Sequence, residues 1–156
     1  MIDLLAQQYS FVLYSRNTIL DYIRTISEED FLQENSNFGR GSIRNLLVHI
    51  CDTYSAWIGE RALNTFVAYK PFEEYKNLDA CIAYFDVVNT YLNDFFTSYA
   101  DNYNVSLKII RHGQIIEVSP LKLFTHVTTH EFHHKGQIMS LSRHLGYIPA
   151  DADIIR

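Results

Sequence analysis

Three histidines and a glutamate stand together in residues 130–134, which read His-Glu-Phe-His-His. His130 and His134 are four residues apart, so on a helix both imidazoles project from one face and can bind the same metal ion. The pattern H-E-x-x-H is also the motif of zinc metalloproteases, in which the glutamate is the general base. The sequence therefore predicts a metal site, and its class depends on the remaining ligands.

The rest of the chain argues against a metalloprotease. A metzincin needs a glycine three residues after the second histidine and a third histidine six residues after it, but these positions hold Gln137 and Ser140. A glutamate ligand on a later helix is excluded too, because no glutamate follows Glu131. A third protein ligand must lie upstream or come from the aspartates of the tail.

Length and composition indicate one globular domain, residues 1–156. Hydrophobic residues make up 47% of the chain and charged residues 20%, and the net charge is -5. No run of lysine and arginine offers the footprint that nucleic acids require, so we expect no nucleic-acid partner. The N-terminus lacks the basic region of a leader, and no apolar run approaches the ~18 residues of a membrane span. We expect a cytoplasmic protein without membrane contact, whose Cys51 and Cys81 are buried helix residues.

Four segments carry apolar residues at the period of a helix, which predicts an all-α fold. They are residues 5–26, 43–64, 78–100 and 120–145. Ser42, Asn77 and Ser119 are suitable N-caps, Pro120 suits a first helical position, and Gly146 ends the last helix.

Two β-prone runs, residues 105–110 and 114–118, flank Arg111-His112-Gly113 and predict a short β-hairpin before the last helix. The connection that contains Lys70 and Pro71 is too long for a tight turn, so the four-helix bundle is not simply up-down-up-down. We expect irregular structure from residue 147 onward. Metal sites in such bundles are built from side chains on facing helices.

On a helical wheel, His134 lies within the apolar stripe of the last helix and His130 lies at its edge. Two buried imidazoles one turn apart need a shared reason to be there, and metal ligation provides one. His133 falls on the flank of the helix.

His49 is the only histidine on the first three predicted helices, which makes it the natural third ligand. Its position is roughly 100° from the centre of the apolar stripe of its own helix, beside Thr53 and Glu60, so it faces the margin of the bundle. A metal at a margin is accessible to substrate, and three protein ligands with open positions are typical of catalytic zinc.

Residues 46–50 (Leu-Leu-Val-His-Ile) with Trp57, residues 130–138 and the closing 143–146 resemble the DinB/YfiT-like superfamily, over essentially the whole chain. The resemblance implies an up-down-down-up four-helix bundle, often dimeric, with a divalent metal held by three histidines. By motif, these ligands are His49, His130 and His134. Members include thiol-dependent S-transferases and a mycothiol-dependent isomerase, and others are described as metal-dependent hydrolases. The resemblance does not imply DNA binding, and Lys135 stands where the motif more often has arginine.

Three imidazoles suit Zn, Ni or Fe(II). Such an ion can lower the pKa of bound water toward ~7 or hold a cosubstrate thiol as thiolate. We therefore expect an enzyme that hydrolyses a small molecule or transfers a low-molecular-weight thiol to it, and the resemblance implies a homodimer. The alternatives are a metal-binding bundle that acts through a protein partner or oligomer, and a member of the family without metal.

Other side chains near the motif have weaker assignments. Glu131 is the nearest candidate for a catalytic base, and a salt bridge is its alternative role. Glu60 and Gln137 are candidates to orient a ligand. Trp57 and His133 are candidates to line the substrate pocket, with core packing and a solvated surface as their alternatives.

Overall fold

The computed structural model describes residues 3–156, and this part of the chain is mostly helical. Its elements in chain order are α1 (Leu4–Ile23), α2 (Glu28–Leu32), α3 (Ile43–Tyr54), the π-helix η1 (Ser55–Ala62), the 3-10 helix η2 (Phe72–Glu74), α4 (Leu78–Tyr99), β1 (Leu107–Arg111), β2 (Gln114–Val118) and α5 (Pro120–His144).

Each long helix begins at a side-chain cap. The side chain of Asp3 accepts hydrogen bonds from two backbone N–H groups of the first turn of α1. Ser42, Asn77 and Ser119 cap α3, α4 and α5 in the same way, as the sequence predicted. After α5, Gly146 takes the left-handed conformation (φ 96°) that ends helices, which is also confirmed.

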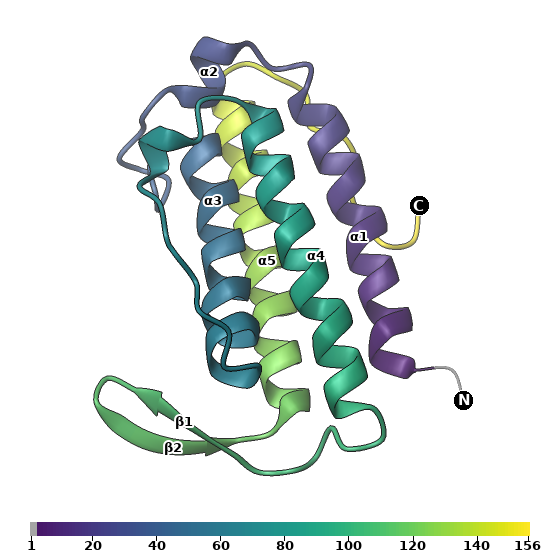
Figure 1. Cartoon of the computed structure of the whole chain (residues 1–156). Coiled ribbons are helices and arrows are strands. Elements are labelled where there is room, and N and C mark those ends of the chain that lie inside the picture. The colour runs from purple at the N-terminus through teal and green to yellow at the C-terminus, as the bar shows by residue number, and fades with distance from the viewer. Residues whose placement is uncertain (1–2) are drawn as a thin grey trace.

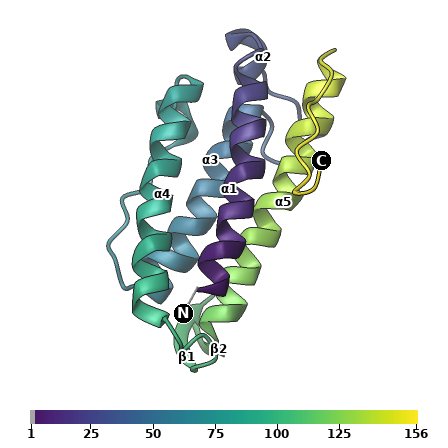
Figure 2. The ribbon, with the colours of Figure 1, turned by 90° about the vertical axis from the view of Figure 1, so that its right-hand side faces the viewer.

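The four long helical segments lie side by side (Figures 1 and 2). Both α1 and α3 pack against α4 and α5, so the core runs along the centre of the molecule. The largest fully buried side chains in it include Tyr54, Phe95, Phe124, Ile19, Ile23, Leu46, Leu92 and Leu123. This packing holds the inner faces of α3 and α5 against each other along their length.

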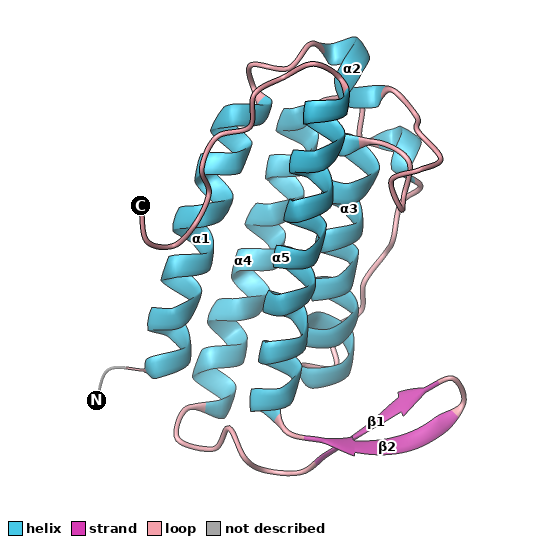
Figure 3. Ribbon diagram, turned by 180° about the vertical axis from the view of Figure 1, so that it is seen from behind, coloured by secondary structure: helices cyan, strands magenta, loops and turns pink. Residues whose placement is uncertain are grey.

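The connections lie at the two ends of the helices. At one end, α2 and the loop of residues 33–42 lead into α3, while the β1–β2 hairpin lies at the other end, between α4 and α5 (Figure 3). The connection of residues 63–77 runs along the outside of α3 from one end to the other (Figure 1). Strands β1 and β2 pair antiparallel, with Ile109 opposite Ile116, which confirms the predicted hairpin.

Two segments differ from the sequence prediction. Ser27 caps the short helix α2 by accepting from Asp30 N, and this helix lies outside the four segments predicted as helical. The helix predicted over residues 43–64 changes to a π-helix at Ser55, and Leu63 N donates to Ile58 O, five residues back. An apolar period of 3.6 residues does not reveal this change, because Ile58 and Ala62 stay on the buried side.

Cys51 and Cys81 are both buried and unbonded, as predicted. No helix within residues 3–156 is long and apolar enough to cross a membrane.

Candidate metal centre

The side chains of His49, His130 and His134 meet where α3 packs against α5. One ring nitrogen of each lies within 4.8 Å of the others. The ring centroids are 5.0 Å apart for His49 and His130, 4.7 Å for His49 and His134, and 4.4 Å for His130 and His134. The structure therefore brings the three predicted ligands together, and they could hold a metal ion.

The hydrogen bonds of His134 direct one nitrogen into this cluster. Its Nδ1 lies 2.6 Å from Gln137 Oε1, and because an amide oxygen only accepts, the ring donates from Nδ1 and keeps a lone pair on Nε2. That Nε2 lies 3.2 Å from His130 Nε2. Two nitrogen ligands of a tetrahedral zinc ion, at 2.0–2.1 Å from it, are about 3.3 Å apart, so the spacing fits a shared metal. Gln137 thus occupies the position of a residue that orients a ligand.

All three imidazoles have lowered pKa values, which keeps them in the neutral form that binds metals. Burial lowers the pKa of His49 to about 3, and the positive charge of Arg40 acts in the same direction. Burial lowers the pKa of His130 to about 4. The pKa of His134 is lowered by burial as well, although the hydrogen bond with Gln137 opposes this shift.

The cluster is accessible to solvent and consists of three candidate ligands. His134 is 7% exposed, while His49 and His130 are half-buried. Within residues 3–156, no cysteine, aspartate, glutamate or further histidine joins the group. Three imidazoles with an accessible side would leave a coordination position open, in contrast to the four protein ligands of a structural zinc site.

The loop before α3 approaches the centre from the side of Gln137. Gly39 has a left-handed backbone (φ 50°), and a Cβ atom there would lie 3.1 Å from Gln137 Oε1. This close approach places the adjacent Arg40 near enough to lower the pKa values of the histidines. The approach of this loop to the centre was not predicted, although its two glycines in a polar stretch are a usable signal of a constrained turn.

Glu131 points away from the histidines into the core. Its Oε1 accepts from Arg16 Nε at 2.9 Å, and its Oε2 accepts from Arg16 Nη2 at 2.8 Å and from Tyr54 Oη at 2.6 Å. Lys135 Nζ lies 3.1 Å from Oε1 and also donates to Ser15 Oγ at 3.2 Å. We call Arg16, Tyr54, Glu131 and Lys135 the buried ionic network.

The network keeps the Glu131 carboxylate ionised and supplies hydrogen bonds to both of its oxygens. Burial by itself would raise the pKa of Glu131, but Arg16, Lys135 and Tyr54 together hold it at about 2. A carboxylate with such a pKa, bound by the donors of three side chains and 0% exposed, is a poor proton acceptor at neutral pH. The geometry supports a role in fixing α5 against α1 and α3. An arginine on the apolar stripe of α1, at Arg16, is the signal in the sequence that could have revealed the network.

The remaining predicted side chains lie at different distances from the centre. His133 is exposed, and its ring centroid lies 4.9 Å from that of His134. The ring of Trp57 lies 4.8 Å from the ring of His126, one turn before His130 on α5. Glu60 accepts from Tyr69 Oη at 2.7 Å, so its carboxylate is engaged outside the cluster.

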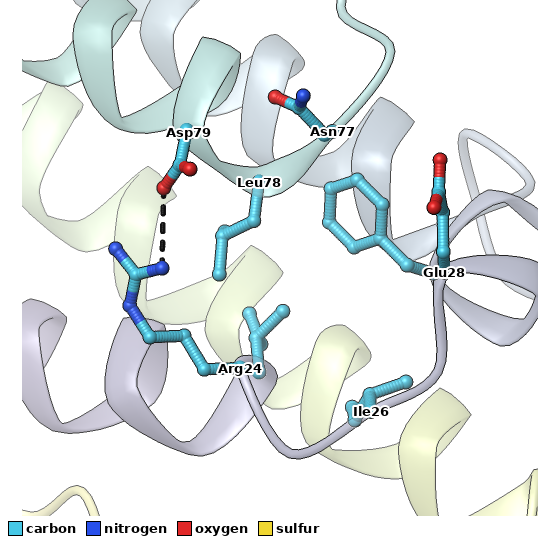
Figure 4. Close-up of a pocket in the computed structure, with 8 residues that line it drawn as sticks. Arg24, Ile26, Glu28, Asn77, Leu78 and Asp79 are labelled. Atoms are coloured by element: carbon cyan, nitrogen blue, oxygen red, sulfur yellow. Dashed lines mark hydrogen bonds and ion pairs between the residues drawn. The ribbon is translucent and has the colours of Figure 1, made fainter.

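A cavity of about 220 Å³ lies away from the histidines, where the end of α1 meets the start of α4 (Figure 4). An exposed ion pair between Arg24 and Asp79, at 3.1 Å, crosses its rim. None of the three clustered histidines lines this cavity, so it is not part of the candidate metal centre.

One comparison with known proteins identifies the family of the chain. No curated protein matches the chain in sequence. The family model described as the DinB family matches residues 1–156, the whole length of the chain, and this match includes the segments around His49 and around His130 to His134. The protein therefore belongs to the DinB family.

Proposed function

We propose that the protein is a metal-dependent enzyme that acts on a small molecule, either by hydrolysis or by thiol-dependent S-transfer. The observation that carries the proposal is the convergence of His49, His130 and His134 from two helices, with their ligand nitrogens within 4.8 Å of one another. Membership of the DinB family is compatible with this activity.

The ion is a divalent metal, and zinc, nickel and iron all suit a set of three imidazoles. When bound, it would supply a nucleophile at neutral pH, by lowering the pKa of a water molecule toward ~7 or by holding a cosubstrate thiol as thiolate.

The residues of the chain have distinct roles in this proposal. Gln137 holds the His134 ring with Nε2 directed toward His130, where an ion would be bound. Glu131 acts at a distance, by fixing the helix that carries His130 and His134. The side chains left to exchange protons with a substrate are His126 and His133, both exposed beside the cluster.

We further propose that residues 1–156 form one domain with the up-down-down-up order of helices. The long connection of residues 63–77, which returns along the outside of α3, supports this order (Figure 1). The resemblance to the DinB/YfiT-like superfamily also supports a homodimer. We propose that it works in the cytoplasm and binds neither nucleic acid nor a membrane.

Cobalt substitution tests whether the centre has an open coordination position. The protein, purified without a histidine tag, is loaded with Co²⁺, and its visible absorption bands are recorded with and without a small thiol. Bands that shift on addition of the thiol support the enzyme. Bands that do not respond to thiol, azide or cyanide indicate a closed structural site and contradict the proposal.

Turnover assays then separate the two reactions. The protein is mixed with an activated ester or an aryl halide, in the presence and absence of a low-molecular-weight thiol. A strict thiol requirement identifies transfer, and turnover without thiol identifies hydrolysis. His134→Ala abolishes either activity, while His144→Ala, an exposed histidine on the same helix, keeps it.

A further inference from the structure

A small pocket lies next to the metal centre, between η1, the β-hairpin and the first turns of α5. Its volume is about 140 Å³. Apolar side chains that include Trp57, Ile116 and Val118 form its walls, and its polar side chains are those of Arg111, Lys122 and His126. We call it the basic pocket.

The charged side chains that line this pocket are all positive. None of the residues that line it is acidic. Successive side chains of a strand point to opposite faces, and Glu117, between Ile116 and Val118, accepts from Ser106 Oγ at 2.9 Å instead of facing the pocket. Within residues 3–156, neither Arg111 nor Lys122 has a carboxylate within 4.0 Å. Their two positive charges are therefore available to a ligand.

The π-helix fixes the aromatic wall of the pocket. Arg61 lies over the Trp57 ring, with Cζ 4.6 Å from the ring centroid, and donates to Ala56 O at 2.7 Å and to Ile110 O at 3.3 Å. It thus ties η1 to strand β1 and adds a third positive charge behind the indole. Irregular helical turns of this kind often occur at functional sites.

His126 joins the basic pocket to the metal centre. Its ring lies 4.8 Å from that of Trp57 and 6.0 Å from that of His130, one turn further along α5. A molecule that extends past His126 can therefore have one end in the pocket and the other at the histidine cluster. The volume of about 140 Å³ is well below the ~300–1,000 Å³ of a site that encloses a whole drug-sized ligand, so it suits one end of a molecule.

We propose that the basic pocket binds the anionic end of the substrate or cosubstrate, a carboxylate, sulfonate or phosphate on a small apolar carbon frame, while the reactive end lies at His49, His130 and His134. The orientation of the ligand toward the metal rests on the proposed function, whereas binding of an organic anion by the pocket does not. Arg111 and Lys122 hold the anion through charge-assisted hydrogen bonds, and Trp57, Ile116 and Val118 contact the carbon frame.

Trp57 is the single tryptophan of the chain, so its fluorescence reports directly on this pocket. The experiment titrates the protein, as purified and after treatment with a chelator, with benzoate and with its neutral analogue benzamide. Benzoate is expected to change the fluorescence saturably in both samples, and increasing salt is expected to weaken its binding. Benzamide is expected to bind at least about tenfold more weakly.

Charge-removing variants locate the bound anion. Arg111→Gln combined with Lys122→Gln is expected to weaken benzoate binding at least about tenfold. Lys108→Gln removes one charge from the outer face of the same hairpin, opposite Glu117, and is expected to bind like the wild type. If the double variant does not fold, Lys122→Gln alone, in the exposed first turn of α5, is expected to show a smaller loss in the same direction.

Two results would overturn the proposal. One is equal affinity for benzoate and benzamide without a salt effect, because the positive charges would then have no role. The other is benzoate binding that the chelator abolishes and the double variant keeps, because the carboxylate would then sit at the metal. A protein that binds no metal but still binds benzoate in the pocket refutes the proposed function and leaves the anion site standing.

Discussion

The ring of His49 meets the ring of His134 at a centroid separation of 4.7 Å, with the two planes 83° apart. His49 belongs to α3 and His134 to α5, two helices that pack directly against each other. An ion held by both rings links the helices in the folded state, while in the unfolded chain these residues are far apart. Metal binding is therefore expected to add to the free energy of unfolding.

Removal of the metal is expected to lower the melting temperature of the wild type. At a free metal concentration 100 times the Kd, binding contributes about 2.7 kcal/mol to stability. The measurement is thermal unfolding followed by circular dichroism, with metal and with chelator. The His49→Ala variant is expected to show almost no difference between the two conditions, and an undiminished difference in that variant would show that His49 is not a ligand.

Gln137→Ala is expected to weaken metal binding, because it removes the acceptor that holds His134 Nδ1. Loss of such an orienting partner typically costs about 10–100-fold in metal affinity. Competition against a chromophoric chelator measures this. Gln137→Glu, which retains an acceptor oxygen, is expected to preserve most of the affinity, and Ser140→Ala, exposed one turn further on, is the control. Equal affinities for Gln137→Ala and the wild type would remove Gln137 from the site.

Protonation of His49 and His130 is expected to have little effect on metal affinity down to about pH 5, because both are neutral in this range. The pKa of His49 is about 3 and that of His130 about 4 in the folded protein, so protons compete with the metal only as the pH approaches these values. Metal titrations at several pH values, with circular dichroism to confirm folding, test this. A loss of affinity of about a hundredfold per pH unit below about pH 6.5, which requires two competing protons, would contradict the lowered pKa values of His49 and His130.

The same pKa values predict that the metal-free protein loses stability in acid. The unfolded chain takes up protons on histidine below about pH 6.5, whereas folded His49 and His130 do so only near pH 3 and 4. The unfolded state binds more protons between these limits, so the free energy of unfolding falls as the pH falls from about 6.5. Urea denaturation at pH 7.5 and pH 5.5 is expected to show a smaller drop for His49→Ala than for the wild type.

Glu131→Gln is expected to destabilise the protein by about 3–5 kcal/mol, because it leaves Arg16 and Lys135 charged in the core without their carboxylate. The exposed Glu73→Gln is expected to change stability by no more than about 0.5 kcal/mol. Urea denaturation measures both variants. The folded fraction of Glu131→Gln is expected to keep its metal, since the Glu131 carboxylate contacts Arg16, Tyr54 and Lys135 and none of the clustered histidines. A variant as stable as the wild type would refute the structural role of the network.

The helices and the hairpin could be predicted from the sequence because neighbouring residues indicate them. The histidine cluster could be predicted because the chain has few histidines. Caps at Ser42, Asn77 and Ser119 lie beside strong apolar periods, and these fix where α3, α4 and α5 begin. His49 was identified as the only histidine on the first three predicted helices and by the family resemblance, although helical geometry alone placed it at the margin of the bundle. The structure shows that the cluster itself lies at that margin, with His130 half-buried as well.

The position of Glu131 could not be predicted from the apolar residues of α5. The buried face of α5 also contains Thr128, Lys135 and Ser142, and these polar residues move the centre of that face away from the centre of the apolar stripe. Glu131 lies close to this shifted centre. A wheel that counts only apolar residues therefore misplaces a glutamate whose partners, Arg16 and Tyr54, come from other helices.

The basic pocket was also beyond the reach of the sequence analysis. Trp57 was a candidate to line a pocket, but Arg111 lies in the hairpin and Lys122 at the start of α5, and only the packing of the hairpin against η1 brings them to the indole. Such long-range convergence of exposed cations leaves no periodic signal in the chain.

The metal content of the protein tests the central claim most directly. The full chain is purified without a histidine tag, and its metal content is measured by inductively coupled plasma mass spectrometry. The variants His49→Ala and His134→Ala and the control His144→Ala are measured in the same way. The three-histidine centre predicts close to one divalent ion per chain in the wild type and in His144→Ala, and strong loss in the other two variants. A wild type without stoichiometric metal after reconstitution, or full metal content in His134→Ala, would contradict it.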